Sequence, residues 1–294
     1  MVRKFASALF LLVLASCSEP APTPPSEGPA HWVIADEDTT LTIFGTVHLL
    51  KPETKWDKAR FEALIKTSDG LILELDESQT SPEVMTPLVM QYGMYPAGDS
   101  LDKHISDDVM GKVTAWAEGK GIPMIAMNQM RPWMVELTVS ITELQAQGLD
   151  PDAGVEKIFE TAAKAANVTI TGLESAEDQI KIFALMSDEH QAKMLADGFD
   201  DIENMEAEMD KMTAVWATGD TAGLAALMNE GMTDDPEFAE AILYARNRNW
   251  IVSIESLMVS NEGAYMMAVG AGHLVGDKSV IDLLEKAGWT VTRQ

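Results

Sequence analysis

Short apolar runs that alternate with longer helical patterns are the feature of this sequence that most constrains its fold. Four runs have the length of a strand, namely Thr39–Phe44, Gly70–Leu75, Val168–Leu173 and Ala264–Val269. Stretches in which apolar residues recur at helical spacing lie between and after them. This alternation is typical of a parallel sheet whose strands are connected by helices packed on its faces. The sequence therefore predicts an α/β fold with a mostly parallel central sheet, flanking helices and a large helical insertion.

The stretch from about residue 131 to 245 is expected to be this insertion, a helical excursion within a single domain that spans residues 31–294. A chain of 294 residues can form one large α/β domain or two small ones. From Ser187 to about Tyr244 the pattern is helical, acidic and rich in methionine. Three methionines there share one helical face, at positions 205, 209 and 212. Core packing accounts for this stripe, and an adaptable apolar wall for a peptide is the alternative.

The N-terminus carries the pattern of a signal peptide. The apolar run Phe5–Val13 follows two basic residues, is too short to span a bilayer, and leads into Leu14-Ala15-Ser16-Cys17. This ending resembles a bacterial lipobox, in which Cys17 is lipidated and becomes the mature N-terminus; an ordinary signal peptide with an incidental cysteine is the alternative. Ser18 after the cysteine favours sorting to the outer membrane. We therefore expect a periplasm-facing protein of the cell envelope with a lipid anchor at Cys17.

Residues 18–30 are expected to form an extended tether between the lipid and the folded domain, because five of the thirteen are prolines.

Charge and cysteine content exclude several classes of function. The chain has 47 acidic and 21 basic side chains, a formal net charge of −26. A nucleic-acid-binding protein needs a basic surface, so we expect no nucleic-acid partner. Since Cys17 is the only cysteine, a disulfide framework, a cysteine-based zinc site and cysteine catalysis are excluded as well.

Residues able to do chemistry follow the four internal strands. His48, Glu74, Glu174 and His273 each come at or shortly after a strand's carboxyl end, where open α/β sheets bind their ligands. The two histidines belong to matching motifs, Gly-x-x-His-Leu followed by an aliphatic residue. Mixed imidazole and carboxylate ligation suits zinc, manganese, iron or cobalt. We therefore predict that both histidines and at least one acid meet and hold a divalent metal.

Other interpretations of these residues are weaker. One Gly-x-x-His occurs by chance in many chains, whereas two copies that each follow a strand are more specific. The segment Gly270–Gly276 approaches a dinucleotide fingerprint, but its last glycine is one residue too far along. His31, His104 and His190 lack a comparable setting and are expected to be surface or packing residues. The serine-hydrolase elbow, the zincin helix motif and the phosphate-binding loop are absent from the sequence.

An ordered set of motifs resembles the TraB/PrgY/GumN family, whose animal relatives are the Tiki proteases. The set covers nearly all of residues 31–294 and consists of Gly45–His48, Glu74-Leu75-Asp76, Pro132-Trp133, Gly172–Glu174 with Gln179, Arg246-Asn247, and Gly270–Gly276 with Gly288. The resemblance implies a fold similar to the erythromycin-esterase/ChaN group. It also implies, from the Tiki branch, a peptidase that depends on manganese or cobalt.

The resemblance carries roles onto individual residues. His48, Glu74 and His273 are the implied metal ligands, and Glu174, Arg246 and Asn247 are the implied catalytic residues. Glu174, or an oxygen near Glu74, would act as a general base, Arg246 would stabilise an oxyanion or a substrate carboxylate, and Asn247 would donate a hydrogen bond. The hypothesis is a metal-dependent hydrolase of peptides or protein segments that uses manganese or cobalt, with zinc as the alternative ion. A peptide- or pheromone-binding module without catalysis and a metal-free esterase-type hydrolase are the alternatives.

Overall fold

The computed structural model describes residues 28–233 and 235–294. The predicted signal peptide, Cys17 and all but the end of the predicted tether lie outside these residues.

A single six-stranded sheet forms the base of the molecule, in the order β4-β3-β5-β2-β1-β6. Four adjacent strands, β4 at one edge followed by β3, β5 and β2, are parallel to one another, whereas β1 is antiparallel to both of its neighbours. The prediction of a mostly parallel sheet is therefore confirmed. The strands are β1 (His31–Ala35), β2 (Thr39–Thr46), β3 (Gly70–Leu73), β4 (Thr169–Gly172), β5 (Gly263–Gly270) and β6 (Thr292–Arg293).

Most of the remaining chain is helical, and several helices begin at a residue whose side chain caps the first turn. Ser106 accepts a hydrogen bond from the Val109 amide, and Ser175 forms a capping box with Asp178. The helices are α1 (Lys58–Lys66), α2 (Pro82–Leu88), α3 (Asp107–Lys120), α4 (Met124–Met127), α5 (Pro132–Ala146), α6 (Val155–Ala166), α7 (Ala176–Ala184), α8 (Asp188–Asp201), α9 (Met205–Ala217), α10 (Thr221–Thr233), α11 (Pro236–Ala239), α12 (Ala245–Ser260) and α13 (Val280–Lys286).

Helices cover both faces of the sheet, so its central strands are buried from two sides. On one face α1 and α6 pack through Phe61 and Phe159 against Phe44 of β2. On the other face α12 and α13 contribute Trp250, Ile254, Val280 and Leu284 to a second core. Burial on both faces explains why these strands appear in the sequence as continuous apolar runs.

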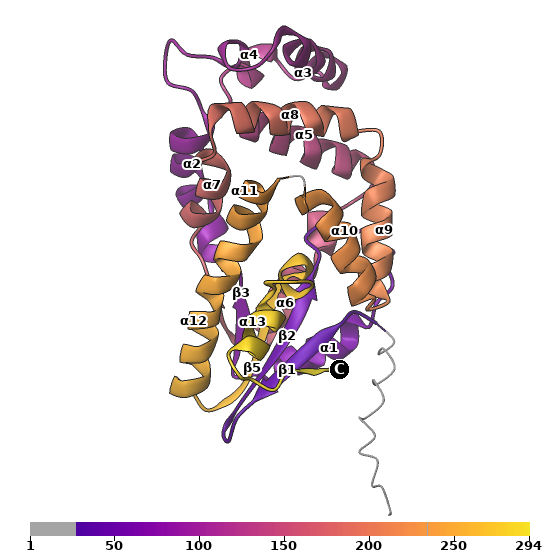
Figure 1. Ribbon diagram of the computed structural model, residues 1–294, viewed down its shortest axis with the longest axis vertical. Helices are drawn as coiled ribbons and strands as arrows, with labels where there is room; N and C mark the ends of the chain where they lie inside the picture. The colour runs from indigo at the N-terminus through magenta and orange to yellow at the C-terminus, as the bar shows by residue number, and fades with distance from the viewer. Residues whose placement is uncertain (1–27, 234) are drawn as a thin grey trace, which may run out of the picture.

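A layer of helices beyond the sheet has a core of its own. Helices α3, α4, α5 and α8 lie together at the end of the molecule farthest from the C-terminus (Figure 1). Their shared core includes Val113, Met127, Val139 and Leu195. The chain returns to the sheet at α6 and β4, so the stretch predicted as a helical excursion is divided into two parts. The helical layer also includes α3 and α4, which precede residue 131.

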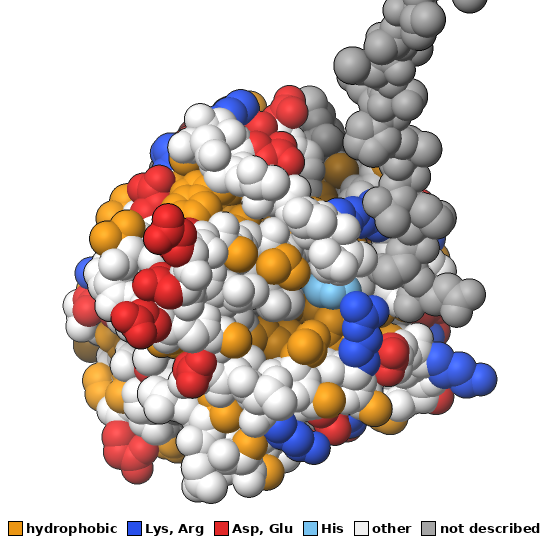
Figure 2. Space-filling model, turned by 90° about the horizontal axis from the view of Figure 1, so that it is seen from below, with side chains coloured by type: hydrophobic (Ala, Val, Ile, Leu, Met, Phe, Trp, Pro, Cys, Tyr) orange, Lys and Arg blue, Asp and Glu red, His pale blue; other side chains and the backbone are white. Residues whose placement is uncertain are grey.

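The surface agrees with the acidic composition. Figure 2 shows acidic side chains scattered over the lower face, with apolar and several basic side chains between them. Within the described parts of the chain, no helix is both long enough and apolar enough to cross a membrane.

Candidate active site

The four parallel strands end at the same edge of the sheet, and all six candidate residues gather there. Glu74 directly follows β3, Glu174 follows β4 by two residues, and His48 follows β2 by two. His273 lies in the short 3-10 turn Ala271–Leu274 that begins where β5 ends. Arg246 and Asn247 come from the first turn of α12, which packs against the sheet.

His273 is held in one orientation and one tautomer. Its Nδ1 lies 2.6 Å from Asn247 Oδ1, and Asn247 Nδ2 donates to the Lys278 carbonyl oxygen at 2.9 Å. The second bond orients the amide, so Nδ1 of His273 carries the proton and Nε2 keeps a lone pair. Burial, opposed only in part by the Glu74 carboxylate, lowers the pKa of His273 to about 3. The imidazole is therefore neutral at neutral pH.

His48 is oriented in the same way by a carboxylate. Its Nδ1 lies 2.7 Å from Glu156 Oε1, and Thr46 Oγ1 donates to the same oxygen. Glu156 reaches this position because the start of α6 docks on the first Gly-x-x-His turn, where the Val155 amide donates to the Val47 carbonyl oxygen at 3.1 Å. The charge of Glu156 raises the pKa of His48 to about 9.

Gly270 marks the point on which these side chains converge. A Cβ atom at this position would lie 3.2 Å from Glu74 Oε1, 3.5 Å from His273 Cδ2 and 3.9 Å from His48 Nε2. His48 Nε2 and the Cδ2 edge of the His273 ring face this common point, and His273 Nε2 lies 3.9 Å from Glu74 Oε1. Because residue 270 is glycine, this space stays open, and this explains why the second Gly-x-x-His motif has a glycine at its first position.

Glu74 is a buried carboxylate with several donors. The Gly270 amide donates to Oε1 at 2.7 Å, while Gln179 Nε2 and Arg246 Nη2 donate to Oε2 at 3.1 and 2.6 Å. Burial alone would raise the pKa of Glu74, but His273, Arg246, His48 and the Gly270 amide together lower it to about 2. The side chain is therefore ionised at neutral pH although only 8% of it is exposed.

Arg246 contacts both glutamates of the site and His273. Its Nη1 lies 3.0 Å from His273 Nε2, and its Nε and Nη2 donate to the two oxygens of Glu174 at 2.9 and 2.8 Å. Its guanidinium carbon lies 4.9 Å from the centre of the Trp250 ring. Trp250 Nε1 in turn donates to Glu174 Oε1 at 2.9 Å.

The sequence assigned Glu174 the role of general base and Asn247 that of a donor to substrate. In the structure both oxygens of Glu174 accept hydrogen bonds from Arg246, Trp250 or Gln179. Asn247 is 1% exposed and bonds His273 and the Lys278 carbonyl. Both residues are thus placed to orient neighbouring side chains.

Two residues of the site were not assigned to it from the sequence. Glu156 lies in the first turn of α6, where an acid is expected for the helix dipole alone, so nothing marked it as special. Trp250 falls one helical turn after Arg246, a spacing that could have suggested stacking on the guanidinium.

A metal-binding arrangement requires more than proximity. Among the residues that the structure describes, no group of three or more histidine, cysteine, aspartate or glutamate side chains is arranged to hold a metal ion. The guanidinium of Arg246 lies between Glu74 Oε2 and His273 Nε2 and bonds both. This cation supplies the physical reason why the atoms do not form a ligand set as they stand.

The site opens into a cleft, on the side where His48 is 67% exposed. This cleft has a volume of about 410 Å³, and its lining includes His48, Glu74, Asp76, Glu156 and Gln179. A volume of this size lies in the range of pockets that bind small ligands.

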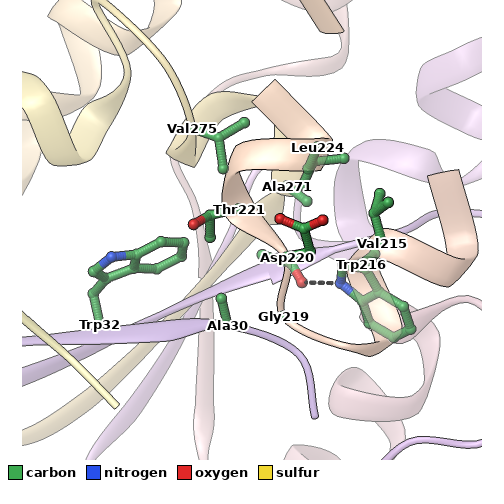
Figure 3. A pocket seen from close by; sticks show the side chains of 11 residues that line it. Ala30, Trp32, Val215, Trp216, Gly219, Asp220, Thr221, Leu224, Ala271 and Val275 are labelled. Atoms are coloured by element: carbon green, nitrogen blue, oxygen red, sulfur yellow. Dashed lines mark hydrogen bonds between the residues drawn. The ribbon is translucent and has the colours of Figure 1, made fainter. Parts of the chain in front are cut away.

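The two Gly-x-x-His turns contact each other directly. A Cβ atom on Gly45 would lie 3.0 Å from the Cβ of Ala271, so the first turn packs against the second only because residue 45 is glycine. Trp216 Nε1 donates to the Gly45 carbonyl oxygen at 2.8 Å (Figure 3). The pocket shown there is about 10 Å³ in volume and has room for about one water molecule. Gly45, Trp216 and Ala271 are among the residues that line it.

The other three histidines lie in packing or ion-pair positions, as expected. His31 packs edge-on against Phe61, and His104 stacks on Tyr95 with ring centres 4.4 Å apart. His190 lies 2.8 Å from Asp235.

Comparison with known proteins gives a family match and several similar sequences. The sequence model of the TraB/PrgY/gumN family matches residues 30–293. The chain is 24% identical over 246 residues to "Uncharacterized protein YbaP" of Escherichia coli strain K12, which covers 82% of this chain and 86% of that protein. It is also 35% identical over 77 residues to "Metalloprotease TIKI homolog" of Amphimedon queenslandica, which covers 26% of this chain and 14% of that protein.

No solved structure matches the chain. The similarity to the erythromycin-esterase/ChaN group therefore stays a prediction.

Proposed function

The chain belongs to the TraB/PrgY/gumN family, and from this premise we propose that it is a metal-dependent hydrolase whose ion is bound by His48, Glu74 and His273. One observation carries the proposal. The Nδ1 atoms of both histidines are bound by Glu156 and Asn247, while His48 Nε2, the His273 ring and Glu74 Oε1 all lie around the open space at Gly270. Histidines that bind metals are oriented in this way by a partner on their other nitrogen.

The charges around the site also favour a divalent cation. The carboxylates of Glu74, Glu156 and Glu174 lie close to two cations, Arg246 and protonated His48. If a divalent ion replaced the proton on His48, the ion and Arg246 together would carry three positive charges, which would balance the three carboxylates. Imidazole and carboxylate ligands suit manganese, cobalt or zinc.

The reaction that this arrangement fits best is hydrolysis of a peptide bond. A bound divalent ion would supply a Lewis acid that polarises a carbonyl group and acidifies water. Arg246 would donate a hydrogen bond to the developing oxyanion, while Glu174 and Trp250 hold the guanidinium. Asn247 keeps His273 in the tautomer whose lone pair is on Nε2, the atom that would bind the ion. The partial similarity to a metalloprotease TIKI homolog supports a peptide or protein segment as the substrate.

Metal binding is tested by elemental analysis and calorimetric titration of the purified protein with manganese, cobalt and zinc. We expect about one ion per chain in the wild type, and no binding at this site in the double variant His48→Ala, His273→Ala. The double variant His104→Ala, His190→Ala is the matched control and should bind as the wild type does. Equal metal content in both double variants would show that the site is misassigned.

Hydrolysis is tested by digesting a peptide library with and without a chelator and analysing the products by mass spectrometry. We expect cleavage that the chelator abolishes and that added manganese or cobalt restores. Peptide binding without cleavage would favour a non-catalytic binding module, and cleavage that resists the chelator would favour a metal-free hydrolase.

We also propose that the protein is anchored in the cell envelope, periplasm-facing, by a lipid on Cys17. The lipobox-like sequence before this residue supports the proposal. Expressed in a Gram-negative host, the wild type should fractionate with the outer membrane, and Cys17→Ala should release it from the membrane fraction. Equal membrane association of both proteins would contradict a lipid anchor.

A further inference from the structure

Arg246 contacts two of the atoms that the proposed ion would need. Its Nη1 lies 3.0 Å from His273 Nε2, and its Nη2 lies 2.6 Å from Glu74 Oε2. Since Asn247 holds the other ring nitrogen of His273, the lone pair of this imidazole is at Nε2. The guanidinium therefore donates to the same lone pair that a metal ion would use.

The guanidinium also has contacts that do not involve the proposed ligands. Its Nε and Nη2 are bound to the two oxygens of Glu174, and Nη1 donates to the Ile242 carbonyl oxygen at 2.9 Å. Its plane lies near the Trp250 ring. These bonds do not depend on His273, so a small shift of the guanidinium that releases Nη1 from Nε2 can leave the bonds to Glu174 in place.

The two buried carboxylates need a cation whether or not a metal is present. Glu74 and Glu174 share Arg246, and both are about nine-tenths buried. Two like charges this close would repel each other and draw in solvent if no cation lay between them. Arg246 therefore keeps Glu74 turned towards the histidines before any ion arrives.

We propose that Arg246 is an internal stand-in for the metal ion, which holds Glu74 and His273 in the ligating orientation in the metal-free protein and gives up its bond to His273 when the ion binds. This inference rests on the proposed metal site. It has one measurable consequence that a purely structural role would not have. The guanidinium and the metal compete for His273 Nε2, so removal of the guanidinium should tighten metal binding while it destabilises the metal-free protein.

The test compares Arg246→Gln with Arg248→Gln, a matched change on the same helix at an arginine that pairs with Glu240 on the surface. Zinc affinity is measured by calorimetry, and thermal unfolding is measured with and without zinc. Arg246→Gln should bind zinc about tenfold more tightly, the equivalent of one lost hydrogen bond to a charged donor. Its metal-free form should melt roughly 10 °C lower because a buried ion pair is broken. Arg248→Gln should change neither property.

Arg246→Lys keeps the positive charge near Glu174 but has fewer donors, so it should fold even if Arg246→Gln does not. We expect it to lie between the wild type and Arg246→Gln in both zinc affinity and melting temperature. A wild type that binds no zinc would overturn the proposed function together with this inference. A wild type that binds zinc, with folded variants that bind it no more tightly, would overturn this inference alone.

Discussion

At the scale of single residues, the site depends on an open space above Gly270 as much as on the side chains around it. Glu74 Oε1, the His273 ring and His48 Nε2 all lie within 4 Å of the place where a Cβ atom would stand. Glu74 cannot easily move away, because the Gly270 amide and Arg246 both hold it. The second Gly-x-x-His motif therefore needs its first glycine for space at the site.

A methyl group at this position should weaken metal binding. Gly270→Ala places a Cβ atom 3.2 Å from Glu74 Oε1, and we expect at least a tenfold loss of zinc affinity with about 1–3 kcal/mol of destabilisation from overpacking. Calorimetry and thermal unfolding measure the two effects. Gly111→Ala in α3 is the control: its Cβ would meet nothing within 4 Å, so it should stabilise the fold by about 0.5–1 kcal/mol and leave affinity unchanged. Unaltered zinc binding in Gly270→Ala would show that the ion does not occupy this space.

The raised pKa of His48 predicts how metal affinity depends on pH. Because this pKa is about 9 in the folded protein, His48 carries a proton at neutral pH, and the His48–Glu156 pair stabilises the fold below about pH 6.5 and ceases to do so as the pH rises through 9. A metal has to displace that proton, so apparent affinity should rise roughly tenfold per pH unit up to about pH 9.

The variant Glu156→Gln removes the charge that raises the pKa of His48. Its metal affinity should therefore reach a plateau at a lower pH, nearer the ordinary pKa of histidine. Calorimetric titrations at several pH values measure this. Glu160→Gln, one turn later on α6 and paired with Lys157 and Lys164, should keep the wild-type profile. Identical profiles for wild type and Glu156→Gln would mean that His48 does not lose a proton when the metal binds.

At the scale of elements, the sequence predicted the parts of the site that are carried by strands better than those carried by helices. A buried strand is visible as a continuous apolar run, so Glu74, Glu174 and the two Gly-x-x-His turns could be placed at one sheet edge from their positions alone. A residue on a helix faces the site only if the helix has the right rotation. The π-helical turn Glu240–Tyr244 directly before α12 changes that rotation. Hence Arg246 could be assigned to the site by resemblance, whereas its contact with His273 could not be predicted.

The start of α7 connects local capping to the site, because this helix carries Gln179, which donates to both Glu74 and Glu174. Ser175→Ala removes the hydroxyl of the capping box and should cost about 1 kcal/mol of stability. If the cap positions Gln179, zinc affinity should fall by a small factor as well. Ser106→Ala, which removes a similar cap from α3 in the helical layer, should cost about the same stability without any change in affinity. Equal zinc affinities in both variants would show that the Ser175 cap does not position Gln179.

At the scale of the whole molecule, the division into a sheet body and a helical layer predicts how the protein loses structure. Two cores lie on the faces of the sheet and the third lies among α3, α4, α5 and α8. The proposed ligands His48, Glu74 and His273 all follow strands of the sheet body. Unfolding of the helical layer should therefore leave the proposed ligands in place.

Leu195→Ala tests this division, because Leu195 is fully buried in the third core where α8 packs on α5. Loss of this side chain should cost about 2–5 kcal/mol locally. Hydrogen exchange followed by mass spectrometry should show faster exchange in residues 107–146 and 188–201, with unchanged protection in β2, β3 and β5 and unchanged zinc affinity. Leu284→Ala, at an equally buried position of the second core, should instead expose the sheet and weaken zinc binding. Uniformly faster exchange in both variants would mean that the two layers unfold as one cooperative unit, and that the site depends on the whole fold.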